Sequence, residues 1–237
     1  MDALIYTAMS GAERTLHEQR VRANNLANLD TGGFRADLGR TASRVVPGYG
    51  YDARHMGLLE ATSVSDREGV LRQTGRELDV AIAGPGYLAV RYDGGEAYTR
   101  AGALAVDGDG NLHSGGRPVL GEGGPIQFGA TETSFTVASD GTVATDAGPN
   151  GRLRIVEFAN PQALTRDGSN LFAGGTPTPA TGTSVMQGFL ERSNVSGVSE
   201  MAEMIRVTRS YESLASLTEK QDELRRSAIQ RLGDANA

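Results

Sequence analysis

The stretch Val198–Leu232 reads VSEMAEMIRVTRSYESLASLTEKQDELRRSAIQRL, 35 residues without a glycine or a proline. It predicts one helix over Ser196–Leu232, roughly 50 Å long at 1.5 Å per residue. Apolar side chains recur at helical spacing in two overlapping series, namely Met201, Met204, Thr208, Tyr211 and Ala215, and Leu214, Leu217, Gln221, Leu224 and Ala228. The two series together form an apolar stripe that shifts around the helix along its length. Because one partner helix covers only a narrow seam, this stripe predicts packing against more than one neighbour.

The start of the chain, Met1–Asn28, predicts a second helix. Its apolar residues are spaced alternately by four and three, as in the heptad seam of a coiled coil, with one polar break at Gln19. The series is Ile5, Met9, Ala12, Leu16, Gln19, Ala23 and Leu26. Neither terminal helix can bury its stripe alone. We therefore expect the two long helices to form a coiled-coil-like unit, with each other or with copies from other chains.

The middle of the chain is rich in turns, since 21 of the 32 glycines lie between Gly84 and Gly188. Asp-Gly pairs separate short apolar runs, which is typical of hairpins. Expected strands include Leu78–Ala83, Tyr87–Tyr92, Ala97–Arg100, Leu104–Val106, Asn111–Ser114, Thr142–Thr145 and Leu153–Phe158. Gly174–Gly182 contains two prolines and predicts a loop. The expected fold class is α+β, with a central antiparallel β-rich domain inserted between the N- and C-terminal helices.

These changes in composition predict four segments. They are an N-terminal helical assembly segment at residues 1–35, a connecting arm at 36–75, the central β-rich domain at 76–190 and a C-terminal helical assembly segment at 191–237.

Composition argues against several classes of protein. Cysteine is absent, which excludes disulfides and thiolate metal sites. A formal net charge of −6, no tryptophan and 5% aromatic residues argue against nucleic-acid binding. No run approaches the about 20 apolar residues of a membrane span, and the N-terminus lacks the basic front of a signal peptide. We expect no nucleic-acid partner, no membrane insertion and no cleaved signal peptide.

Common catalytic motifs are missing from the sequence, including the zinc-protease, serine-hydrolase and P-loop patterns. Residues 107–111, DGDGN, resemble the first half of a calcium loop, but Leu112 and Pro118 replace its required glycine and glutamate. This segment predicts a hairpin turn. We expect no cofactor, no metal and no enzymatic activity. The alternatives are a β-fold hydrolase that uses an Asp/Glu pair, and a monomeric β-rich binding module with both helices buried.

Three motifs resemble the rod and hook axial proteins of the bacterial flagellum. Residues 23–35, ANNLANLDTGGFR, resemble that family's first signature through Asn24, Asn25, Leu26, Asn28, Thr31, Gly33 and Phe34. Residues 76–90, RELDVAIAGPGYLAV, resemble its central strand motif through Leu78, Asp79, Val80, Gly84 and Gly86. The C-terminal signature is matched by LERSNV at 190–195, through Ser193, Asn194 and Val195.

The resemblance covers nearly the whole chain and implies a structural part of the flagellar rod. It implies export by the flagellar type III apparatus and helical assembly in the periplasm to transmit torque from the motor to the hook. Partners would be copies of the chain, other proximal- and distal-rod proteins and surrounding ring proteins. The first twelve residues resemble proximal-rod members, with the distal rod as the alternative.

The expected assembly interface is the set of apolar residues on the two terminal helices. These are Ile5, Met9, Leu16, Leu26, Met201, Met204, Tyr211, Leu214, Leu217 and Leu224.

Overall fold

The computed structural model describes residues 2–45, 55–93, 95–129, 132, 134–168 and 170–234. The side chains of residues 2–8, 40–62, 228–229 and 232–234, which include Ile5, lie outside this description. The chain divides into two units. The helical unit contains Met1–Leu26, Leu38–Thr62 and Gly197–Ala237, and the β unit contains Ala27–Asp37 and Ser63–Ser196.

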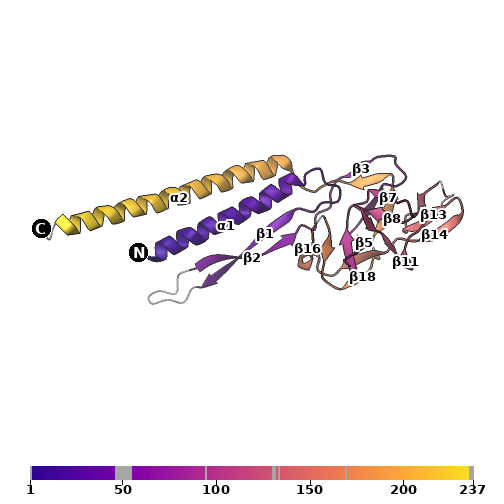
Figure 1. Ribbon diagram of the computed structural model, residues 1–237, viewed down its shortest axis with the longest axis horizontal. Helices are drawn as coiled ribbons and strands as arrows, with labels where there is room; N and C mark the ends of the chain where they lie inside the picture. Colours follow the sequence, from indigo (N-terminus) through magenta and orange to yellow (C-terminus); the bar gives the residue numbers. More distant parts are fainter. Residues whose placement is uncertain are drawn as a thin grey trace. The chain divides into compact units, whose positions relative to one another are not determined.

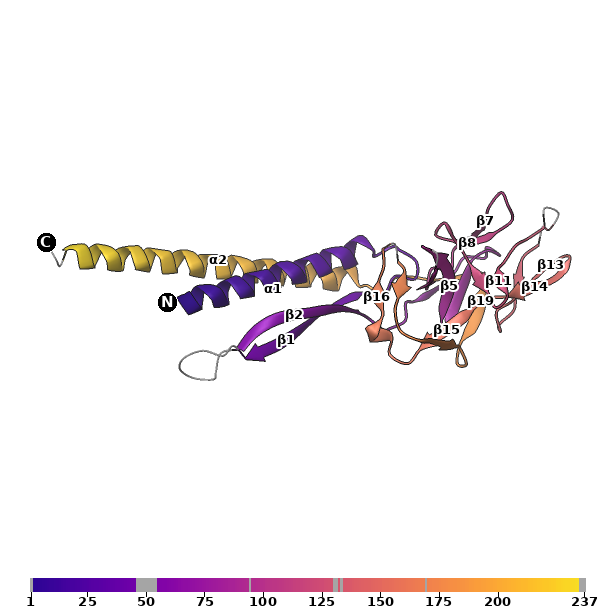
Figure 2. The same ribbon diagram turned by 60° about the horizontal axis from the view of Figure 1, so that its bottom comes forward.

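The helical unit contains α1 (Asp2–Ala27), α2 (Gly197–Asp234) and most of a two-stranded sheet of β1 (Asp37–Val45) and β2 (His55–Val64). The helices run antiparallel and side by side, and α2 extends past the start of α1 in both views (Figures 1 and 2). Both predicted helices are confirmed to within two residues at each end. The long β1–β2 hairpin was not predicted as strand.

The prediction of a coiled-coil-like unit is wrong. In a coiled coil the seam residues insert between those of the partner helix. Here Met9 and Leu16, from the predicted seam of α1, are exposed in the described chain, at 62% and 38%. The contact with α2 instead uses another face of α1, where Gly11 lies against Leu214 and Arg22 against Glu200. These contacts use a small residue and an ion pair, and Met9 and Leu16 of the predicted seam lie outside them.

The β unit consists of short strands joined by tight turns, with one 3₁₀ turn, η1 (Pro161–Ala163). The strands are β3 (Leu71–Gln73), β4 (Val80–Ala83), β5 (Tyr87–Tyr92), β6 (Gly95–Thr99), β7 (Leu104–Val106), β8 (Leu112–Ser114), β9 (Arg117–Pro118), β10 (Leu120–Gly121), β11 (Gly124–Pro125), β12 (Thr136–Val137), β13 (Thr142–Thr145), β14 (Gly148–Arg152), β15 (Ile155–Phe158), β16 (Thr165–Arg166), β17 (Phe172–Ala173), β18 (Pro177–Pro179), β19 (Ser184–Gln187) and β20 (Phe189–Glu191).

The main sheet has six strands in the order β16-β17-β6-β5-β15-β18, and its described pairings are antiparallel. The first four residues of β5 are all buried, because both faces of this part of the strand are covered. Leu88 and Val90 pack into one apolar cluster, whereas Tyr87 and Ala89 pack into a second cluster. The smaller sheets are β12-β13-β14, β7-β8-β9, β10-β11, β19-β4 and β20-β3.

Several strand predictions are confirmed, and β5, β7 and β13 have the predicted bounds. The predicted loop Gly174–Gly182 is wrong in part, because it contains β18, which pairs with β15. Proline lacks the N–H that a central strand must donate, so a Pro-rich strand is tolerated at a sheet edge. Strand β18 lies at such an edge of the main sheet.

Candidate functional site

The first and last family-like motifs meet inside the β unit. The backbone N–H of Gly33 donates to the carbonyl of Glu191 at 2.8 Å, and the N–H of Asn194 donates to the carbonyl of Phe34 at 3.2 Å. The Asn194 side chain adds a bond, because its Oδ1 accepts from the N–H of Ala36 at 2.7 Å. Direct hydrogen bonds thus join two segments that lie about 160 residues apart in the sequence.

Three buried charges lie at this junction, and we call Arg35, Arg100 and Glu191 the arginine–glutamate cluster. Glu191 Oε1 is 3.0 Å from Arg35 Nη2, and Glu191 Oε2 is 3.4 Å from Arg100 Nη1. Each of the three side chains is only 1% exposed. Burial lowers the pKa of the Arg100 guanidinium, and the adjacent Glu191 carboxylate opposes that change. One buried carboxylate, with the exposed Glu68 at 3.9 Å from Arg100, therefore neutralises part of a buried pair of cations.

Neutral partners complete the cluster. Arg35 donates through Nη1 to the carbonyl of Asp66 at 2.7 Å, Arg100 donates to the carbonyl of Ile82 at 2.8 Å, and Glu191 accepts from the N–H of Gly69 at 2.9 Å. Removing one partner of such a buried ion pair is strongly destabilising, because the remaining charge has lost its water. The cluster therefore fixes three distant segments of the β unit in one arrangement.

Gly33 is required at the junction for two reasons. Its φ is +68°, in the left-handed region that side chains disfavour. A Cβ at this position would lie 2.3 Å from the carbonyl carbon and oxygen of Arg100. The backbone of the first motif can therefore approach the Arg100 segment only without a side chain.

The remaining residues of the first and last motifs support the same region or belong to α1. Thr31 donates through Oγ1 to Asn28 Oδ1 at 3.1 Å, and Phe34 is buried under the Arg166 guanidinium. Ser193 Oγ accepts from the N–H of Val195 at 3.3 Å.

Three residues of the first motif belong to α1. Asn24 is exposed, Asn25 is buried and Leu26 is half-buried.

The central motif builds the core of the β unit. Val80 is buried in the first apolar cluster and Leu78 packs against it. The carbonyl of Asp79 accepts from the N–H of Gly188 at 2.7 Å. Gly84 and Gly86 form the turn from β4 to β5, and a Cβ on Gly86 would lie 2.7 Å from Ile155 Cγ2.

The apolar residues predicted on the helices do not come together within the chain. Leu217 and Leu224 on α2 are exposed at 53% and 71%. Leu214 and Met204 are half-buried, and Leu214 is used against Gly11 of the same chain. Exposed apolar residues of α2 that were predicted are Met201, Tyr211, Leu217 and Leu224; those that the sequence reasoning missed are Val198 and Ile205.

Three family models match consecutive parts of the chain. They are described as "Flagella basal body rod protein" at residues 5–35, "Flagellar hook protein FlgE/F/G D1 domain" at 81–145 and "Flagellar basal body rod FlgEFG protein C-terminal" at 186–231. Arg35, Arg100 and Glu191 fall one in each matched part.

Curated relatives match over nearly the full length. The flagellar basal-body rod protein FlgF of Escherichia coli K12 is 38% identical over 90% of this chain and 91% of its own. FlgF of Caulobacter vibrioides is 35% identical over the whole of both chains, and FlgG of Bacillus subtilis 168 is 33% identical over 93% of this chain and 95% of its own. The chain belongs to the FlgF-type flagellar basal-body rod proteins. It is a structural rod component of the flagellar basal body.

In this rod protein the segment DGDGN forms the predicted hairpin turn, between β7 and β8. Asp107 Oδ1 accepts from the N–H of Asp109 at 3.0 Å and from the N–H of Asn111 at 2.8 Å. The Asn111 amide also donates to the same carboxylate. Among the described residues, no group of three potential metal ligands is present.

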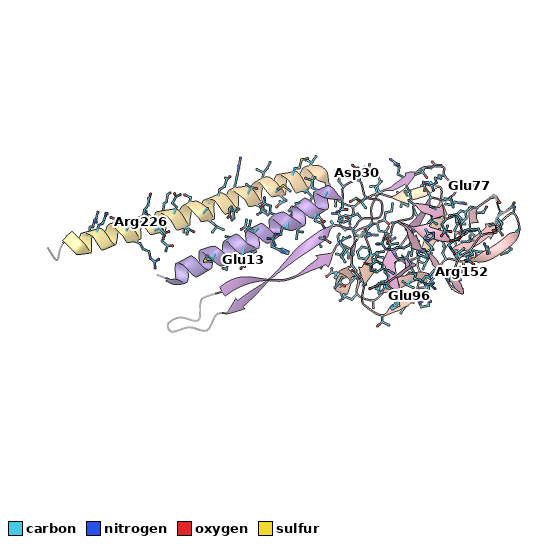
Figure 3. The ribbon with its side chains drawn as sticks, viewed as in Figure 1. Glu13, Asp30, Glu77, Glu96, Arg152 and Arg226 are labelled. Carbon is cyan, nitrogen blue, oxygen red and sulfur yellow. The ribbon has the colours of Figure 1, made fainter. Side chains whose placement is uncertain are left out.

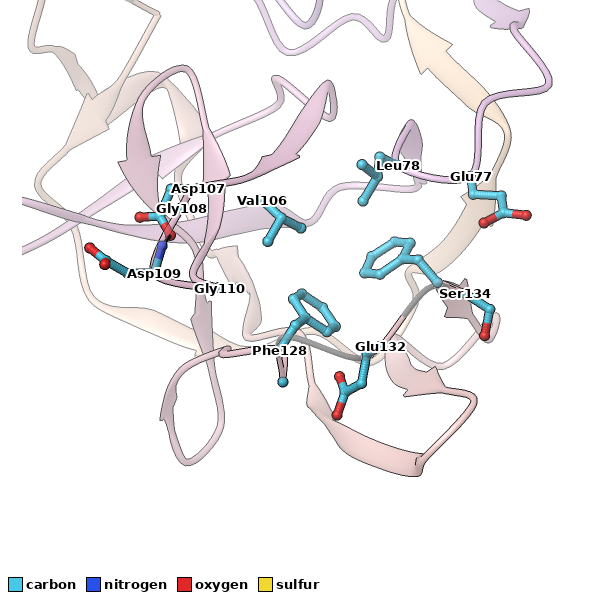
Figure 4. Close-up of a pocket in the computed structure, with 12 residues that line it drawn as sticks. Glu77, Leu78, Val106, Asp107, Gly108, Asp109, Gly110, Phe128, Glu132 and Ser134 are labelled. Carbon is cyan, nitrogen blue, oxygen red and sulfur yellow. Dashed lines mark hydrogen bonds between the residues drawn. The ribbon is translucent and has the colours of Figure 1, made fainter.

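A cavity of about 560 Å³ lies beside this hairpin in the rod protein's β unit (Figure 4). Leu78, Val106 and Phe128 point into it, while the carboxylates of Glu77 and Asp109 point away from it. Glu77 and Asp109 therefore form no convergent pair of carboxylates in this cavity, which Asp107 and Glu132 also line. Within the described ranges, neither helix is long and apolar enough to cross a membrane.

Proposed function

We propose that this rod protein assembles through its helical unit, and that neighbouring subunits cover the apolar residues exposed on α1 and α2. The main supporting observation is that Met201 and Leu217 are exposed on the part of α2 that runs beside α1, and that Leu224 is exposed further along α2. Scattered exposed apolar residues are ordinary on a soluble protein. Here they recur along one helix, which supports contacts with partners.

The positions of these residues support at least two neighbours. At about 100° per residue, Leu217 and Leu224 lie on nearly the same line along α2. Val198, Met201 and Ile205 lie roughly a quarter turn or more away from that line. One helix cannot cover both groups, so we propose that α2 contacts different subunits along its length. Contacts of this heterologous kind propagate helically instead of closing into a dimer.

In this proposal the β unit is the rigid body and the helical unit makes the joints between subunits. The charges of the arginine–glutamate cluster are paired inside the chain, which supports a unit that keeps its shape when torque passes through it. We place the protein in the proximal rod in the periplasm, exported by the flagellar type III apparatus without a cleaved signal peptide. Its partners are other rod proteins and ring proteins, and it performs no catalysis.

The test is Leu217→Asp, which adds a charge to an exposed apolar site of α2. The chain should fold with an unchanged thermal midpoint, because Leu217 is not buried within it. Rod assembly and swimming should be lost, because a charge buried without a partner at an interface costs several kcal/mol. Electron microscopy of isolated basal bodies and swimming in soft agar measure the result.

The matched control is Val70→Asp in the β unit, where the parent side chain is 73% exposed. It also replaces an exposed apolar side chain by a carboxylate, at a site outside the helical unit. Swimming should persist with this control. Normal swimming with Leu217→Asp would contradict assembly through this face.

A further inference from the structure

A basic groove runs between α1 and α2 in the helical unit. Its volume is about 800 Å³, and Gly11, Ala202 and Ile205 are among its lining residues. Arg14, Arg206 and Arg209 line it, and the described lining residues include no acid. Gly11 and Ala202 have no bulky side chain that would keep another helix away, while the guanidinium groups favour a partner that carries a carboxylate. The groove therefore suits an apolar helix face with an acidic residue in it.

The arginines of the groove differ in how they are paired within the chain. Arg14 is 3.6 Å from Glu18 and Arg206 is paired with Glu203, both within one helical turn at the surface. Exposed pairs of this kind are weak and can exchange partners. Arg209 is exposed and makes no ion pair with any described residue. It is thus the cation in the groove most available to a partner.

The exposed seam of α1 has the complementary chemistry. Met9, Glu13 and Leu16 are spaced by four and three residues, so they share one face of the helix. All three are exposed, and Glu13, labelled on α1 in Figure 3, makes no ion pair among the described residues. The face is therefore two apolar side chains with one unpaired carboxylate between them.

The seam and the groove lie on different sides of the helical unit. Leu16 and Met9 are two residues after and five residues before Arg14, which places them about 200° and 220° around α1 from it. A chain therefore cannot insert its own seam into its own groove. Two copies can make this contact only head to tail, and the free groove and seam left at the ends allow further copies to add.

We propose that the α1–α2 groove of one subunit receives the Met9–Glu13–Leu16 face of α1 from a second copy, with Glu13 paired to Arg209. This rests on the proposed function and names the surfaces of one of its joints. The helical unit contains 12 acidic and 12 basic residues, so its formal net charge is zero and copies can approach without net repulsion.

The test is a charge exchange in the full-length protein. Glu13→Arg alone and Arg209→Glu alone should each reduce swimming and rod assembly sharply, because like charges then meet in the joint. The double variant E13R/R209E should regain most of both. Glu219→Arg, which also replaces an exposed acid on a helix but does not line the groove, is the control and should swim normally. Thermal unfolding of each purified variant checks that folding is unchanged.

Cross-linking supplies a second measurement, because the natural chain has no cysteine. Basal bodies from cells that produce both the E13C and R209C variants, one of them tagged, should yield a disulfide-linked pair containing one of each. Assembled basal bodies without this pair would overturn the proposal, as would a double variant no better than the single variants. If Leu217→Asp still prevents assembly in that case, the proposed function stands and only this joint is wrong.

Discussion

The two units of this rod protein differ in which side chains they bury and which they leave exposed. In the β unit even a glutamate and two arginines are 1% exposed, and each has its partners within the chain. In the helical unit large apolar side chains such as Met9 and Leu224 are left exposed. A unit whose buried charges are paired within the chain can fold by itself. A unit that exposes large apolar side chains gains stability when a partner covers them.

The charge balance follows the same division. The helical unit is formally neutral, and the β unit contains 17 acidic and 11 basic residues, so it carries the whole net charge of −6. Like-charged β units repel one another, which opposes their direct association at low salt. We therefore expect substitutions in the core of the β unit to lower the stability of the fold. Substitutions on the exposed faces of the helical unit should instead impair rod assembly.

The largest expected effect on folding is that of Glu191→Gln. It removes the buried carboxylate between Arg35 and Arg100, and the exposed Glu68, 3.9 Å from Arg100, replaces little of its charge. We expect a loss of about 3–5 kcal/mol in the free energy of unfolding. Chemical denaturation of the purified chain measures it.

The control for Glu191 is Glu96→Gln, because Glu96 pairs with Arg154 at 3.2 Å where both side chains are more than a third exposed. Such a surface pair contributes about 1 kcal/mol or less. Equal losses in the two variants would mean that burial of the arginine–glutamate cluster does not stabilise the β unit.

A smaller effect is expected from Gly33→Ala. Its control, Gly75→Ala, has nearly the same φ of +71° but has nothing within 4 Å of the added Cβ. The control should cost about 1–2 kcal/mol from the backbone alone. Gly33→Ala should cost about 1–3 kcal/mol more, because the methyl group also collides with the Arg100 carbonyl. Denaturation midpoints of both variants give the difference, and equal midpoints would refute the close approach.

The smallest effect is expected in the β7–β8 turn. The Asn111 side-chain amide, and then its backbone N–H, hold the pKa of Asp107 below its ordinary value. A lowered carboxyl pKa stabilises the fold above the unfolded value of about 3.9, and this contribution is lost as the pH falls.

Asp107→Ala should therefore lower the thermal midpoint slightly at neutral pH, and the gap from the parent chain should close as the solution is acidified. Asp109→Ala is the control, since its carboxylate makes no hydrogen bond among the described residues. A gap that stays constant with pH would assign the effect to something other than the Asp107 carboxylate.

The helices and hairpins such as β5–β6 and β7–β8 could be predicted because their signals are local. A run of 35 residues without glycine or proline fixes α2, and Asp-Gly pairs fix turns such as the one before Leu112. The β1–β2 hairpin and β18 lack such signals. Their pairing depends on partner strands, and an edge position makes the prolines of β18 acceptable.

The features of the candidate site can likewise be divided into those that the sequence predicts and those that only the tertiary structure shows. The sequence by itself determined where the family motifs lie and which helix residues are apolar, because residue identity and spacing are read along one chain. Only the tertiary structure decided that Arg35, Arg100 and Glu191 meet, and that α1 turns Gly11 rather than its apolar seam toward α2. Both depend on residues far apart in the sequence, whose contacts are set by packing in three dimensions.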